Sequence, residues 1–543
     1  MNFKKMMKQS VVLSLSASLL VSGGTLAFAK GNNTDAGETY GFSHITRADM
    51  LKIPAQQNSE QFKVPEFDAS TIQNIPSAVK YDENGNKIEM DVWDSWPLQN
   101  ADGTVANYKG YEIVFALAGD PKRGSDTFIY MFYKKAGETS LSSWKNAGRV
   151  FKDSDKLVPG DTLLNDQAEE WSGSATMTSD GKIRLFYTNR QAWAPERGFY
   201  GKQILTTAQV NVSAPNKNTL KIDGVEDLKS IYDGKDGEIY QNVESTGFSQ
   251  GDYNDNHTLR DPHYVEDKGR KYLVFEANTG KKTGYQGAES LNNPAYYGGT
   301  KAFFEAERKK LLESPVRAFA EIANGALGII ELNDDYTFKK ELKPLIASNT
   351  VTDEIERPNV FKLRGKWYLF TSSRGSKMYI DGIDDEDIYL LGYVSNSLTG
   401  PYKPLNGTGL VLHQDLDPND ITWTYAHFAI PQVKGNNVVI TSYMTNRGFF
   451  EDHHSTFAPS FLLNIKNSTT SVVKDSILEQ GQITISTDNP NKPNGNSNGN
   501  GNSNGNGNSN GNGNSNGNGN SNGNSNGNGN SNGNGNSNHN HSK

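Results

Sequence analysis

Five segments of this chain repeat one pattern of polar and apolar positions. Each has a glycine, one or two polar residues, and then an apolar run rich in strand-forming residues that closes on a small or polar residue. The five segments begin at Gly110, Gly181, Gly269, Gly365 and Gly435. Turn residues such as Asp102-Gly103 and Ser179-Asp180 precede the apolar runs. The pattern therefore predicts five β-hairpins, with each run as the second arm of its hairpin.

The spacing of the hairpins predicts how they are organised. Their glycines are 70 to 96 residues apart, which leaves room for one four-stranded sheet per repeat with some insertions. Radial repetition of such sheets is a β-propeller, so we expect an all-β fold with five blades around a central pocket. An array of ordinary β-sandwiches is the alternative. Helical spacing at Lys301–Leu312 and Val316–Asn324 predicts a helical insertion, and a short helix is expected near Thr46.

Both ends of the chain differ in composition from the region between them. Residues 1–29 combine early lysines, an apolar run from Val11 to Val21 and Ala27-Phe28-Ala29, which is typical of a secretory signal peptide. We expect residues 30–45 to form a flexible segment and 46–486 the propeller. Residues 487–543, mostly Asn, Gly and Ser, are expected to be a disordered tail. Its two terminal histidines, His539 and His541, fit solvated ends better than a metal site.

Composition excludes several classes of function. The net charge is −8 and the basic residues are scattered, which argues against nucleic acid as a partner. No segment is long and apolar enough for a membrane-spanning helix. The absence of cysteine means that an exported protein would need a large core or bound ions in place of disulfides.

The first arm of each hairpin contains a polar motif where a strand should be apolar. Asp94, Asp261 and Glu356 lie in three of these motifs. Because equivalent positions of radial repeats face the same centre, we expect the three carboxylates to meet in one pocket. Two carboxyl groups can cleave an acetal, one as nucleophile and one as proton donor. Glu354, two residues before Glu356, is expected to share its strand face as a second pocket acid or as a partner for an arginine.

Four motifs make the chain resemble a known family. Val92–Leu98, Glu170–Ser174, Leu259–His263 and Asp353–Pro358 are similar to signatures of bacterial levansucrases and inulosucrases, the fructansucrases of glycoside hydrolase family 68. The similarity runs from about Thr46 to Thr484. It implies a five-bladed propeller that transfers fructose from sucrose.

The resemblance also implies roles for individual residues. Asp94 would be the nucleophile, Glu356 the general acid and then base, and Asp261 the stabiliser of the fructosyl cation. Further positions match the fructosyl subsite and the glucosyl or acceptor subsite: Trp93, Trp171, Ser172 and Arg260 for the former, Glu354, Arg374, Tyr425 and Arg447 for the latter. Residues 191–201 differ from the family pattern, which leaves contacts at the rim open.

The resemblance further implies a structural calcium ion and no organic cofactor. The matching ligands are Asp255, Gln286, Asn324, Asp353 and the main-chain carbonyl of Ile322, and oxygen ligands suit calcium. Without the resemblance, residues 252–256 would be interpreted as an acidic turn.

The expected function is a secreted, monomeric levansucrase that forms β-(2→6) fructan, with sucrose, water and growing fructan chains as partners. The alternatives are an inulosucrase forming β-(2→1) fructan, an invertase-like hydrolase, and a propeller that only binds glycans.

Overall fold

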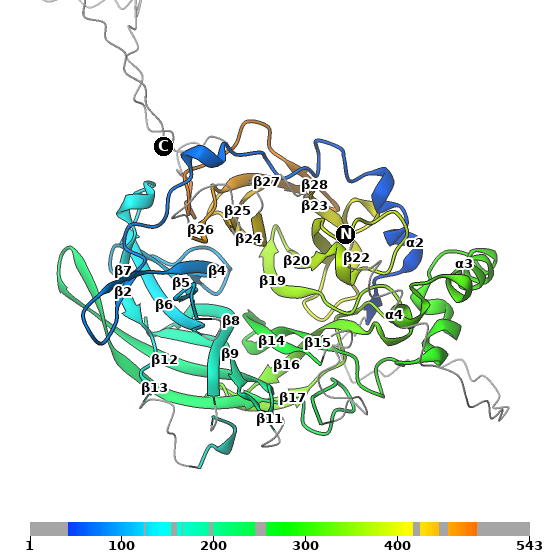
Figure 1. Ribbon diagram of the computed structural model, residues 1–543, viewed down its shortest axis with the longest axis horizontal. Coiled ribbons are helices and arrows are strands. Elements are labelled where there is room, and N and C mark those ends of the chain that lie inside the picture. The colour runs from blue at the N-terminus through cyan, green and yellow to red at the C-terminus, as the bar shows by residue number, and fades with distance from the viewer. Residues whose placement is uncertain are drawn as a thin grey trace, which may run out of the picture. The chain divides into compact units, whose positions relative to one another are not determined.

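The computed structural model describes residues 42–123, 126–153, 160–164, 167–194, 199–244, 257–415, 424–444 and 454–485. The predicted signal peptide, residues 30–41 and the predicted tail lie outside the described residues. Within them, four-stranded antiparallel units are arranged as blades around a centre (Figure 1). The innermost strands contact one another in the order β4, β8, β14, β19 and β24, and β24 contacts β4 again. The fold is therefore a closed five-bladed β-propeller, as predicted.

Each blade starts at its innermost strand. Blades 1 and 2 consist of β4 (Asp91–Gln99), β5 (Tyr111–Gly119), β6 (Phe128–Lys135) and β7 (Lys145–Arg149), then β8 (Gln167–Met177), β9 (Ile183–Gln191), β12 (Gln203–Asn216) and β13 (Thr219–Tyr232). Blade 3 consists of β14 (Leu259–Asp267), β15 (Arg270–Asn278), β16 (Gly325–Leu332) and β17 (Phe338–Glu341), with β18 (Ile346–Ala347) and β1 (Ser43–His44). Blade 4 consists of β19 (Glu356–Leu363), β20 (Lys366–Arg374) and β21 (Ile388–Ser395), with β22 (Lys403–Pro404) and β23 (Leu410–Gln414). Blade 5 consists of β24 (Thr424–Pro431), β25 (Asn437–Met444), β27 (Phe461–Lys466) and β28 (Thr469–Val472), with β26 (Thr456–Phe457). Two small hairpins are separate: β2 (Val79–Tyr81) with β3 (Lys87–Glu89), and β10 (Trp193–Ala194) with β11 (Phe199–Tyr200).

The five predicted hairpins pair the first two strands of each blade, so the repeat was interpreted correctly. Buried apolar side chains fill the space between neighbouring blades. Phe115 of blade 1 and Leu185 of blade 2 belong to one such cluster, and Phe370 of blade 4 and Val438 of blade 5 to another. Equivalent clusters join the other three pairs of neighbours, blade 5 with blade 1 included. The core is therefore a ring of interfaces, and the polar groups are left to the centre and the surface.

All five innermost strands are interrupted at the same place. The pairing register shifts between Val92 and Ser95, Trp171 and Gly173, Arg260 and His263, Glu356 and Asn359, and Tyr425 and Phe428. These interruptions are β-bulges, which bend a strand and redirect its side chains. Asp261, Arg357 and Ala426 adopt the left-handed conformation there, with φ of 57°, 54° and 56°. Because of the bulges, the side chains at these positions do not have to alternate between the two faces of the blade.

Helices occur outside the blades. The insertion between β15 and β16 contains α3 (Lys301–Glu313) and α4 (Arg317–Ile322), which confirms the predicted helical excursion. The helix expected near Thr46 is α2 (Arg47–Met50), and the hydroxyl of Thr46 caps it by accepting a hydrogen bond from Asp49 N. Short 3-10 turns complete the described elements: η2 (Ile53–Ala55), η3 (Ala69–Thr71), η4 (Leu141–Ser143), η6 (Thr162–Leu164), η8 (Ala288–Asn292), η9 (Pro294–Tyr296), η10 (Gly375–Lys377) and η11 (Leu405–Gly407). Among the described helices, none has the length and apolarity that crossing a membrane requires.

A buried ion pair fixes the N-terminal segment to the insertion. Arg47, 2% exposed, donates from Nε to Oε1 of Glu307 over 2.9 Å and from Nη1 to the carbonyls of Thr350 and Tyr379. One guanidinium therefore connects α2, α3 and two loops of blades 3 and 4.

Candidate active site

The three predicted carboxylates belong to the innermost strands of three different blades. Asp94 lies on β4 of blade 1, Asp261 on β14 of blade 3 and Glu356 at the start of β19 of blade 4. The first two lie within the bulges and Glu356 borders one. Hydrogen bonds and ion pairs between the blades join all three into one network, so the structure brings them together around the central space.

Asp94 is held by blades 2 and 4. Its Oδ2 accepts a hydrogen bond of 2.5 Å from the hydroxyl of Ser172 and lies 3.3 Å from Nη1 of Arg357. Ser172 owes its place to the bulge at Gly173, where a Cβ atom would lie 1.9 Å from the carbonyl oxygen of Phe186. Only glycine fits this close approach. A hydroxyl donor and a guanidinium on one oxygen stabilise the negative charge and orient the carboxylate.

Asp261 lies beside Asp94 but in a more buried setting. It is 7% exposed, its backbone N–H donates to the hydroxyl of Thr188, and its Oδ2 accepts from the backbone N–H of Arg357 over 3.2 Å. Burial raises the pKa of Asp261 to about 6; Arg260 opposes the shift, and the charge of Asp94 adds to it. The two aspartates therefore lie close enough to influence each other electrostatically.

Glu356 is surrounded by donors and by another acid. Its Oε1 accepts a hydrogen bond of 3.0 Å from Nη2 of Arg260, and its Oε2 accepts one from the hydroxyl of Tyr425. Burial and, after it, the nearby charge of Glu354 raise the pKa of Glu356 to about 7, while Arg260 and Arg374 oppose the shift. A carboxyl that stays protonated near neutral pH is what a proton donor requires.

Arg260 connects three glutamates. It donates to both carboxylate oxygens of Glu276 over 2.7 and 3.1 Å, lies 3.3 Å from Oε2 of Glu354 and contacts Glu356. Burial raises the pKa of Glu276 well above its usual value. Burial would also raise the pKa of Glu354, but Arg260, Lys377 and Arg374 lower it below the ordinary value. The pKa of Glu276 is therefore raised and that of Glu354 lowered, although both carboxylates contact the same guanidinium.

The expected position of Glu354 was wrong in one respect. It was predicted to share a strand face with Glu356, but β19 begins at Glu356 and Glu354 lies in the preceding loop. The two carboxylates still meet, because both reach the guanidinium of Arg260. Glu354 is therefore an ion-pair partner of an arginine, which was one of the two expected roles.

Aromatic side chains and arginines surround the acids. Trp93 is partly buried against the cluster between blades 1 and 2. Nε1 of Trp171 donates to Glu169 over 3.1 Å. The guanidinium of Arg260 lies 5.9 Å from the centroid of the Trp171 ring. Arg374 lies over the ring of Tyr425 at 4.6 Å. Aromatic rings suit the apolar C–H faces of a sugar, and the planar guanidinium groups beside them can donate hydrogen bonds to its hydroxyls.

Sequence reasoning missed three residues of this network. Arg357 is 4% exposed and contacts Asp94, while its Nη2 donates to the carbonyl of Ser95. Glu276 binds Arg260 from β15, and the ring of Tyr443 packs edge-on against Tyr425. Arg357 could have been found because it directly follows Glu356 and precedes a proline. Glu276 and Tyr443 lie on second strands that carry no such motif. The predicted subsite residue Arg447 lies outside the described residues.

Four of the five predicted calcium ligands are described, and they lie together. Gln286 donates from Nε2 to the carbonyl oxygen of Ile322 over 3.1 Å, and the backbone N–H of Asn324 donates to Oδ1 of Asp353 over 3.2 Å. Asn324 and Asp353 are 0% exposed. A buried carboxylate beside amide and carbonyl oxygens is a donor set that suits calcium. Asp255 lies outside the described residues.

Chemically, the network can cleave an acetal in two steps. Asp94 offers an oriented carboxylate, Glu356 a carboxyl with a raised pKa, and Asp261 a third acid beside Asp94. If a nucleophilic carboxylate and a proton-donating carboxyl are about 5–5.5 Å apart, attack forms a covalent intermediate and the configuration is retained.

Comparison with known proteins gives a consistent result. A sequence profile of a glycoside hydrolase family 68, described as Levansucrase/Invertase, matches residues 34–484. The chain is 69% identical over 488 residues to a levansucrase of Bacillus subtilis (strain 168), which covers 89% of this chain and 100% of that relative. It is 67% identical over 488 residues, with the same coverage, to a protein of Geobacillus stearothermophilus named "Inactive levansucrase". A crystal structure of a levansucrase variant complexed with sucrose matches with a TM-score of 0.76 and 70% identity, over 83% of this chain and 99% of that one.

Proposed function

The chain belongs to glycoside hydrolase family 68, and we propose that it is a levansucrase that transfers the fructosyl group of sucrose to growing β-(2→6) fructan, with some hydrolysis of sucrose. One observation supports this above the others: Asp94, oriented by Ser172 and Arg357, meets in one network with Glu356, whose pKa is raised to about 7 by burial and by the charge of Glu354. The reaction needs an oriented carboxylate as nucleophile and a carboxyl that holds its proton near neutral pH as donor. Since one similar relative is named inactive, the proposal depends on these residues more than on overall identity.

In the first step, the Asp94 carboxylate attacks C2 of the fructosyl group while the bond from C2 to the glucosyl oxygen breaks. The proton of Glu356 passes to that oxygen, so glucose leaves neutral. Positive charge develops on the fructosyl ring in the transition state, and Asp261 beside Asp94 stabilises it through the ring hydroxyls. The product is a covalent fructosyl ester of Asp94.

In the second step, Glu356, now ionised, accepts the proton of an acceptor hydroxyl. The acceptor oxygen attacks C2 and the ester bond to Asp94 breaks, which regenerates both carboxyl groups in their original states. A fructan hydroxyl as acceptor extends the polymer, and water gives hydrolysis. Arg374 and Tyr425, which contact each other beside Glu356, are placed to orient the leaving glucose and the incoming acceptor.

Product analysis tests the proposed function. With sucrose in excess, we expect glucose to exceed free fructose and carbon NMR of the polymer to give β-(2→6) linkages. Equal amounts of glucose and fructose would mean a hydrolase, and β-(2→1) signals would mean an inulosucrase. Asp94→Asn, Asp261→Asn and Glu356→Gln should each lower turnover by orders of magnitude with unchanged circular dichroism. Unchanged turnover in any of the three would contradict its assigned role.

We further propose that Gln286, Ile322, Asn324 and Asp353, with Asp255, hold a structural calcium ion. The ion would link the insertion between β15 and β16 to the loop before β19. Because a ligand that binds only the folded state stabilises it by mass action, a chelator should lower the melting temperature and added calcium should restore it. Asp353→Asn should remove this calcium dependence. A melting temperature that ignores both chelator and calcium would refute the site.

The proposal extends to location and assembly. The N-terminal charged and apolar residues support export of the chain, and we propose that it acts outside the cell as a monomer. Fractionation of culture medium and light scattering of the purified protein test these two points: retention in cells or a larger mass would contradict them.

A further inference from the structure

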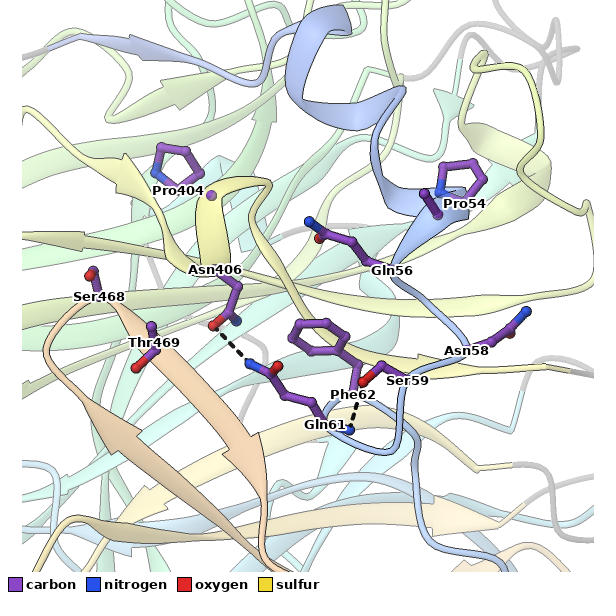
Figure 2. Close-up of a pocket in the computed structure, with 12 residues that line it drawn as sticks. Pro54, Gln56, Asn58, Ser59, Gln61, Phe62, Pro404, Asn406, Ser468 and Thr469 are labelled. Atoms are coloured by element: carbon purple, nitrogen blue, oxygen red, sulfur yellow. Dashed lines mark hydrogen bonds between the residues drawn. The ribbon is translucent and has the colours of Figure 1, made fainter.

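A concave surface lies at the outer edge of the blades. Its volume is about 840 Å³, and it lies between residues 54–62, the η11 turn and the turn of the β27–β28 hairpin (Figure 2). β22 and β28 end the strand orders of blades 4 and 5 on the side away from β19 and β24. The proposed catalytic carboxylates lie on innermost strands. This surface, called the outer groove below, is therefore separate from the central carboxylates.

The outer groove is polar but uncharged. Charged residues make up 21% of the chain, yet none of the twelve residues that line the groove is charged. Amide side chains such as Gln56 and Gln61 and hydroxyls such as Ser59 and Thr469 provide donors and acceptors, and Pro54 provides an apolar ring face. Amides hydrogen-bond neighbouring hydroxyls without requiring a charge, so this lining suits a neutral polyhydroxylated ligand rather than an ion.

Hydrogen bonds between distant segments hold the walls in place. Nε2 of Gln61 donates to the carbonyl of Thr470 over 2.7 Å and to Oδ1 of Asn406 over 3.4 Å, the contact drawn in Figure 2. Asn406 adopts the left-handed conformation with φ of 55° and donates to the hydroxyl of Thr470 over 2.8 Å. The hydroxyl of Thr408 donates to Gln56. Because the walls are fixed before binding, a ligand would lose little affinity to their ordering.

We infer that the outer groove binds a stretch of the fructan product, outside the catalytic pocket. The inference rests on the proposed function, because that reaction makes a neutral polymer of fructose units. A few hydrogen bonds to neutral hydroxyls give weak binding, but a polymer held at the groove stays at a raised effective concentration near its own active site. The groove should therefore affect the length of the polymer and not the rate of the first chemical step.

Replacing two lining residues tests this. Asn58 and Ser468 have exposed side chains that take no part in the hydrogen bonds described above, so Asn58→Leu with Ser468→Leu removes two polar groups from the groove, narrows it and leaves its frame intact. The matched control is Asn84→Leu with Ser179→Leu, two exposed positions outside the groove. We expect the groove variant to release glucose from sucrose at the parent initial rate and to make fructan at least about twofold shorter in mean length. The control should match the parent in both.

Hydrogen–deuterium exchange locates the binding. In the full chain with Asp94→Asn, a β-(2→6) fructo-oligosaccharide should slow exchange in residues 54–63 and 466–470, and the added leucine pair should abolish that protection. Absence of protection, or equal polymer lengths from the groove variant and its control, would overturn the inference. Failure of the proposed function is distinct from this, because then the parent itself would make no fructan from sucrose.

Discussion

Replacing Arg357 with glutamine tests whether its ion pair determines the reactivity of Asp94. Nη1 of Arg357 lies 3.3 Å from Oδ2 of Asp94. At an effective dielectric constant of about 20, unit charges at that distance attract by about 5 kcal/mol. Desolvation and neighbouring charges cancel much of this, and a remainder of about 1.5–3 kcal/mol corresponds to a rate change of about 10- to 150-fold. Arg357→Gln should therefore lower kcat/KM by about that factor, because the Asp94 carboxylate loses the cation that orients it.

The assay is initial glucose release over a range of sucrose concentrations, which gives kcat and KM separately. Arg357→Lys is the matched variant: it keeps the charge but not the hydrogen bond from Nη2 to the carbonyl of Ser95. We expect the lysine variant to recover only part of the lost kcat/KM, because an ammonium keeps the charge near Asp94 but cannot reproduce the planar geometry of the guanidinium. Melting curves control for folding. A folded Arg357→Gln variant with the parent kcat/KM would refute the role of the ion pair.

Three further predictions concern pH and stability. The pKa of Glu356, raised to about 7 chiefly by burial, implies that activity is present below that pH and is lost as the pH rises through it, because the proton donor ionises. A pH–rate profile that stays level to pH 9 would contradict this. Glu354→Gln removes a charge that raises the same pKa, so the basic limb should move to lower pH, and a limb that moves up or not at all would count against their coupling. Arg47→Met should lower the free energy of unfolding, measured by denaturant titration, by about 3–5 kcal/mol, because it leaves Glu307 buried without its partner. Lys52→Met, which breaks the exposed pair with Asp49, should lower it by less than about 1 kcal/mol.

Much of the fold could be predicted because its signals are local. Turn residues before an apolar run specify a hairpin wherever the hairpin ends up, and the helical period of residues 301–313 specifies a helix. The proposed catalytic residues were predictable in part because polar residues interrupt strands that are otherwise buried. Pro262 and Pro358 also belong to this signal, since proline lacks an N–H and is tolerated at a bulge on an edge strand.

The rest of the site could not be predicted, since it depends on contacts between blades. Glu276 is an ordinary strand residue until Arg260 pairs with it, and the position of Glu354 was wrong because the strand begins two residues later than its alternation suggested. Arg357 shows the same limit. Its side chain reaches Asp94 of blade 1 while its backbone reaches Asp261 of blade 3.

The sequence by itself determined the repeating hairpins, the inserted helices and the kinds of side chain on each first arm, because alternation, turn chemistry and bulge-tolerant prolines act over a few residues. The spacing of the hairpins also predicted five blades with Asp94, Asp261 and Glu356 at their centre. Only the tertiary structure decided which residues of other blades hold these acids, such as Arg357 beside Asp94 and Arg260 beside Glu356. The reason is physical: burial and neighbouring charges raise the pKa of Asp261 and of Glu356, and both causes exist only once distant blades pack together.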